Sequence, residues 1–185
     1  MKILISLIVG LIAITATAHE PVNTTGLKAS SAEEVLLFQI ERSRDADEIW
    51  YTVNLDYDGS VNREMPLKVF WVKKSEDNRI EPLTAIQKRF SYGIKTVQAG
   101  PSMTGEWNFS LAAYKNRVFT LKKTTGGPYK VYTLSEGRNI EILKMYVKFS
   151  GGTFLSPSVE FVQLSGIDLL SGNEIIEIIT GEKGI

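Results

Sequence analysis

The alternation of apolar and polar residues with a period of two constrains this chain more than any other feature. In the segment EIWYTVNLDY, Ile49, Tyr51 and Val53 fall on one side, whereas Trp50 and Thr52 fall on the other. Side chains alternate between the two faces of a β-strand, so this pattern is typical of a half-buried strand. Segments of the same kind, rich in β-branched and aromatic residues, recur along the chain between Gly, Pro and Asn turn signals.

About nine such segments at short spacing, interrupted by a single helical pattern, predict an all-β domain. We expect an antiparallel β-sandwich, because the segments 36–40 and 144–149 carry apolar side chains on both faces. A β-barrel is the alternative, since periodicity alone does not distinguish these architectures. The residues expected in the core on this basis are Val69, Trp71, Phe109 and Leu111.

The segment EPLTAIQKRFSYG breaks the period of two. Pro82 suits the first position of a helix and Gly93 suits its end, which predicts a helix from Pro82 to about Tyr92. This helix should bury an apolar stripe against an open end or edge of the sheet, like a plug. The stripe consists of Leu83, Ile86 and Phe90. In the alternative interpretation the helix flanks a cleft, where Lys88, Arg89 and Tyr92 would bind an anionic ligand.

The N-terminus has the pattern of a secretory signal peptide. One lysine precedes an apolar run from Ile3 to Ile14, and a small-residue end follows, which predicts cleavage after Ala18. We therefore divide the chain into a signal peptide (1–18), a flexible lead-in (19–33) and one β-rich domain (34–185). The apolar run is too short for a comfortable membrane span, which needs roughly 20 residues. The expected location is the periplasm or the outside of a Gram-negative bacterium, with no transmembrane segment after cleavage.

Composition excludes several classes of function. The 21 basic residues balance the 21 acidic ones, so no excess positive charge attracts nucleic acid. The chain has no cysteine and one histidine, His19, which rules out an ordinary zinc site, a Cys–His pair and a Ser-His-Asp triad. The densest charge run, ERSRDADE, lies between two expected strands, and we interpret it as a solvated hairpin tip.

The segment NLDYDGSVNREM has the spacing of a calcium loop. Asn54, Asp56 and Asp58 take its first, third and fifth positions, Gly59 the sixth, and Asn62 the ninth. The last position, normally a bidentate glutamate, is a methionine, and strands flank the segment where an EF-hand has helices. A tight hairpin turn is therefore the favoured interpretation, because Asp58-Gly59 tolerates positive φ. Calcium remains the only cofactor that the sequence suggests.

Two functional hypotheses from different classes follow. The first is a non-catalytic, exported binding module for a small molecule, a glycan or an envelope protein. The second is a periplasmic hydrolase that uses paired carboxylates, for which Glu41 and Asp56 on neighbouring strands are the candidates. We favour binding, because an exported β-domain without internal His or Cys has few routes to catalysis.

Several segments together resemble a known family. They are LFQIERS (37–43), YTVNLDYDG (51–59), VFWVK (69–73), LTAIQKRFSYG (83–93), AAYKNR (112–117), KMYVKF (144–149) and VEFVQLSGIDLLSG (159–172). The chain resembles an exported Gram-negative family catalogued as domain of unknown function 4833. The resemblance covers roughly residues 35–179 and implies export and a single domain. It assigns no catalytic or binding residue.

Overall fold

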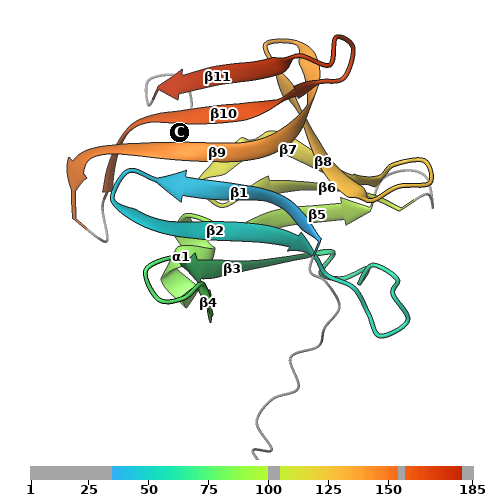
Figure 1. Cartoon of the computed structure of the whole chain (residues 1–185), viewed down its shortest axis with the longest axis horizontal. Coiled ribbons are helices and arrows are strands. Elements are labelled where there is room, and N and C mark those ends of the chain that lie inside the picture. Colours follow the sequence, from blue (N-terminus) through green and yellow to red (C-terminus); the bar gives the residue numbers. More distant parts are fainter. Residues whose placement is uncertain (1–34, 100–104, 154–156, 181–185) are drawn as a thin grey trace, which may run out of the picture. The chain divides into compact units, whose positions relative to one another are not determined.

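The computed structural model describes residues 35–99, 105–153 and 157–180, which lie within one compact unit of residues 33–185. The signal peptide and lead-in predicted from the sequence lie outside the described residues. The described part contains eleven strands and one short helix (Figure 1). The elements are β1 (Leu36–Arg42), β2 (Asp45–Val53), β3 (Leu67–Lys73), β4 (Arg79–Pro82), α1 (Ala85–Phe90), β5 (Ile94–Ala99), β6 (Glu106–Leu111), β7 (Tyr114–Lys123), β8 (Tyr129–Ser135), β9 (Arg138–Gly152), β10 (Pro157–Asp168) and β11 (Glu174–Thr180). No helix among these residues is long and apolar enough to cross a membrane.

The strands form one hydrogen-bonded sheet instead of two separate ones. Nine of them follow the path β4-β3-β2-β1-β9-β8-β7-β6-β5, which curls into an open half-barrel. The hairpin of β10 and β11 branches from this path at β9. The all-β prediction and the single short helix are confirmed, whereas the sandwich arrangement is not.

Strand β9 is the branch point of the sheet. Its N-terminal part pairs with β8 and its residues Lys144–Val147 pair with β1, while β10 pairs along its length. A strand has only two hydrogen-bonding edges, so β8 and β1 share one edge of β9 and diverge from it. The β1–β9 pairing is parallel, and the other pairings are antiparallel. The expectation of a wholly antiparallel domain is therefore wrong at this pairing.

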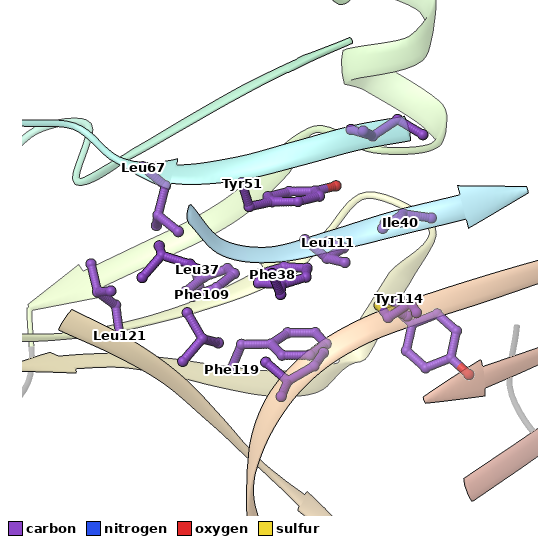
Figure 2. Close-up of a cluster of buried hydrophobic side chains, with 14 of the residues drawn as sticks. Leu37, Phe38, Ile40, Tyr51, Leu67, Phe109, Leu111, Tyr114, Phe119 and Leu121 are labelled. Carbon is purple, nitrogen blue, oxygen red and sulfur yellow. The ribbon is translucent and has the colours of Figure 1, made fainter. Parts of the chain in front are cut away.

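The core lies between the two diverging halves of the sheet. Phe38 of β1 stacks on Tyr51 of β2 with 4.3 Å between ring centroids, and on Phe119 of β7 at 6.2 Å. Phe119 also stacks on Phe109 of β6 at 5.5 Å. Figure 2 shows the rings from β1 and β2 facing those from β6 and β7. The predicted core is confirmed for Trp71, Phe109 and Leu111, which are buried, while Val69 is only half-buried.

Helix α1 is shorter than predicted and buries less. Pro82 ends β4, and Thr84 caps the helix by accepting a hydrogen bond from the backbone N–H of Gln87, whose side chain accepts one from the Thr84 N–H. This capping box places the start at Ala85. Of the expected apolar stripe only Leu83 is buried, because Ile86 and Phe90 are 50% and 62% exposed. The prediction of a buried stripe along a plug is therefore wrong.

Candidate functional site

An apolar cavity of about 320 Å³ opens where the two halves of the sheet diverge. Its walls come from β1, β9 and β10, from the end of β6, the start of β7 and the turn between them, and from the end of α1 with the segment that follows it. The larger aliphatic residues of the lining are Ile40, Leu111, Met145, Val147, Val159 and Val162. This volume is at the lower limit of ordinary ligand pockets, which run from roughly 300 to 1,000 Å³.

Four aromatic side chains also line the cavity: Phe90, Tyr92, Tyr114 and Phe149. Tyr114 is buried, and its hydroxyl points away from the Phe38–Phe119 stack (Figure 2). Burial raises the pKa of Tyr114 to about 12, with a smaller upward contribution from Glu177 and a downward one from Arg117. The Tyr114 hydroxyl has no hydrogen-bond partner in the described part of the chain.

Tyr92 is held in the cavity wall by contacts from three strands. Its carbonyl oxygen accepts a hydrogen bond from the Tyr51 hydroxyl at 2.6 Å, and its ring packs edge-on against Trp71 at 5.8 Å. Its hydroxyl accepts a long hydrogen bond, 3.5 Å, from Nη1 of Arg42. The next residue, Gly93, passes so close to α1 that an added Cβ would lie 1.9 Å from the carbonyl oxygen of Lys88. Only glycine therefore allows the chain to leave the helix along this path.

Arg42 is the charged group most deeply embedded beside the cavity. Its guanidinium lies 4.3 Å from the centre of the Trp71 ring and forms an ion pair with Asp45. Burial alone would lower the pKa of Arg42, but the hydrogen bond to Asp45 and the nearby Tyr92 outweigh it, so the pKa is raised. Arg42 is therefore a permanent cation whose charge Asp45 compensates.

The structure brings only part of the predicted ligand site together. Tyr92 lines the cavity, as the cleft interpretation expects, whereas Lys88 and Arg89 are exposed and lie outside its lining. The Arg89 guanidinium nevertheless lies 5.1 Å from the ring centre of Phe90, which is a lining residue. The sequence did not single out Arg42 or the aliphatic wall, since strands distant in the chain supply them.

The loop between β2 and β3 has the hydrogen bonds of a tight turn. Asp58 accepts bonds from the backbone and hydroxyl of Ser60, which lower its pKa, and Asp56 accepts one at 2.9 Å from Asn62. The Asn54 side chain donates to the backbone carbonyl of Met65 at 2.7 Å. No group of three or more His, Cys, Asp or Glu suited to a metal occurs within the described ranges. The local geometry supports the hairpin interpretation, and calcium binding stays a prediction.

Glu41 and Asp56 are not brought together. Glu41 forms an ion pair with Lys144 at 3.4 Å and lies near the β1–β2 turn, whereas Asp56 lies in the loop beyond the opposite end of β2. Leu36 pairs with Thr52, and Glu41 lies five positions further along β1, about 17 Å at ~3.3 Å per residue. Paired glycosidase carboxylates are only about 5–9.5 Å apart. The arrangement therefore gives no support to the paired-carboxylate hypothesis.

A second hollow, of about 470 Å³, lies over β7 and β8. Polar residues form much of its lining, among them Asn116, Arg117 and Asn139. Arg117 already makes a bidentate pair with Glu177, at 2.7 and 2.8 Å, and donates to the Leu134 carbonyl. Arg117 is the only cationic residue in the lining of this hollow, and Glu177 already pairs with it. This hollow is therefore a weaker candidate for a ligand site than the apolar cavity.

The described residues therefore form a curled, β-rich sheet whose best candidate for a ligand site is the apolar cavity. The model of the family described as domain of unknown function DUF4833 matches residues 38–178. The chain therefore belongs to this family, and the resemblance found in the sequence is confirmed. No curated protein and no solved structure matches the chain.

Proposed function

We propose that this protein is a non-catalytic binding module that holds a small, mainly apolar molecule in the cavity beside Tyr92. The observation that carries this proposal is the apolar lining of a cavity of about 320 Å³. Apolar surface that faces water is unfavourable, and a ligand that covers it gains free energy roughly in proportion to the area removed from water. A cavity of this size takes roughly ten water-sized groups at about 30 Å³ each.

The lining favours an apolar molecule over a glycan. A sugar needs many hydrogen-bonding partners, and each of its hydroxyl groups would lose free energy in an apolar environment. Aliphatic side chains dominate the walls. The Tyr92 hydroxyl already accepts a hydrogen bond from Arg42, and the Tyr114 hydroxyl is buried. An aliphatic ligand of about ten heavy atoms therefore fits the site better in both size and chemistry.

Calorimetric titration with octan-1-ol tests this proposal. The wild-type protein should bind it, and Val159→Trp, which places an indole in the cavity from β10, should abolish binding. Ile178→Trp is the matched control, because Ile178 is an exposed aliphatic residue on β11 outside the cavity lining. Absence of binding to wild-type protein, or equal binding by wild type and Val159→Trp, would overturn the proposed function.

We also propose that the protein acts in the periplasm or outside a Gram-negative cell. The support is the sequence of residues 1–18, with one lysine, an apolar run and a small-residue end. Expression of the full chain in a Gram-negative host should give a periplasmic protein whose first residue is His19. Recovery from the envelope of a chain that still begins at Met1 would contradict this location.

A further inference from the structure

Three arginines outside the lining of the apolar cavity each contact a different aromatic residue of that lining. Arg44 lies 4.4 Å from the ring centre of Phe149, and Arg89 lies 5.1 Å from that of Phe90. The third, Arg42, donates a hydrogen bond to the hydroxyl of Tyr92. These arginines come from the β1–β2 turn region and from α1, so two separate elements bring positive charge to one rim.

Two of these charges are available to a ligand. Arg42 is compensated by Asp45, whereas Arg44 and Arg89 are exposed and pair with no carboxylate in the described part of the chain. Besides its contact with Phe149, Arg44 donates a hydrogen bond to the carbonyl oxygen of Gly151. A guanidinium has five N–H donors, so most of those of Arg44 and Arg89 remain free to bind an anion.

We propose that the ligand is an amphipathic anion, with an aliphatic tail in the cavity and a carboxylate at the rim beside Arg44 and Arg89. This inference rests on the proposed function and specifies its ligand class. The cavity volume limits the tail to a medium-length chain of about eight carbons, by the same estimate of roughly 30 Å³ per group. Arginine is suited to the head group, because its planar fork of donors matches a carboxylate and stacks on aromatic rings.

The rim discriminates between charges because it carries a net positive charge next to an apolar wall. A cationic head group would be repelled by Arg44 and Arg89, and a neutral one would form no ion pair with them. The interaction lies at the surface and should weaken as salt is added. Burial of the tail, by contrast, should be insensitive to moderate salt.

The test compares octanoate, octan-1-ol and octylammonium by calorimetry on the full mature protein. We expect octanoate to bind at least about fivefold more tightly than octan-1-ol, which corresponds to one partly exposed ion pair. Arg44→Gln and Arg89→Gln should each weaken octanoate binding by about threefold to fivefold, and the double variant by about tenfold or more. Binding of octan-1-ol should change by less than about twofold in these variants, because no ion pair is lost.

Arg138→Gln is the matched control. Like the other two changes, it removes one positive charge from an exposed arginine. Arg138 is the first residue of β9, pairs with Glu136, and lies far along the strand from the cavity residue Val147. Octanoate binding should not change in this variant. If octanoate and octan-1-ol bind equally, or if octylammonium binds most tightly, the anionic class is overturned while the apolar cavity stands. If none of the three binds, the proposed function itself fails.

Discussion

Two buried tyrosines allow a matched test of the hydrogen bonding around the cavity. Tyr51 and Tyr114 are 0% and 6% exposed, so both rings are packed in the interior. The Tyr51 hydroxyl donates to the carbonyl oxygen of Tyr92 at 2.6 Å, whereas the Tyr114 hydroxyl has no partner among the residues that the structure describes. A Tyr→Phe change at each position removes one hydroxyl and leaves the ring in place.

The two changes should have opposite effects on the free energy of unfolding. Tyr51→Phe removes a hydrogen bond and leaves the half-buried carbonyl of Tyr92 without that donor, which should destabilise the protein by about 1–2 kcal/mol. Tyr114→Phe removes a hydroxyl that loses its hydration on folding and gains no hydrogen bond in return. This change should stabilise the protein by roughly 1 kcal/mol.

Urea unfolding followed by tryptophan fluorescence measures both effects, because Trp71 and Trp107 are buried and should respond to unfolding. The transition midpoint should fall for Tyr51→Phe and rise for Tyr114→Phe, with an unchanged dependence on urea. In thermal unfolding each kcal/mol should correspond to about 2–4 °C. A destabilisation of about 1 kcal/mol or more by Tyr114→Phe would show that its hydroxyl is hydrogen-bonded and would refute the reasoning.

Three further predictions concern pH, the core and calcium. The pKa of Tyr114 is about 12 in the folded protein against an ordinary 10.0, so the unfolded chain loses this proton first and the free energy of unfolding falls as the pH rises from 10 toward 12. Wild type should therefore lose stability in this range more steeply than Tyr114→Phe, and equal slopes would contradict this. Trp71→Ala should cost about 3–5 kcal/mol in urea unfolding, because a buried ring is lost, and a cost below about 1 kcal/mol would place Trp71 at the surface. Calcium should leave the melting temperature unchanged, because Asp58 is already bonded to Ser60; a rise that Asp58→Asn abolishes would instead establish a calcium site.

The sequence predicted what depends on local pattern. Strand periodicity placed Trp71, Phe109 and Leu111 in the core, because alternation along one strand determines which face a side chain occupies. The helix was predicted too long, although the signal for its true start was present in Thr84 and Gln87, which form the capping box. The parallel pairing of β1 with β9 left no local signal, since it joins segments far apart in the chain.

The candidate site was predictable only in part for the same reason. Tyr92 was singled out by its position at the end of the helical segment, and it does line the cavity. Arg42 and Arg44 belong to a charge run that was interpreted as a solvated hairpin tip, and Arg44 is indeed exposed. Their contacts with Tyr92 and Phe149 depend on tertiary packing, which no local spacing in the sequence reveals.

The position of β9 between β1 and β8 has a consequence for the order of folding. Glu41 and Lys144, which meet across the β1–β9 pairing, are separated by 103 positions in the chain. Pairings of such long range close a large loop before they gain any contact, which makes them slow to form. The hairpins from β5 to β8 can assemble from neighbouring segments, but β1 cannot complete the sheet until β9 has formed. Until that step, the apolar face that carries Phe38 and Ile40 lacks the β1–β9 pairing that helps to cover it, so folding intermediates should expose these two side chains.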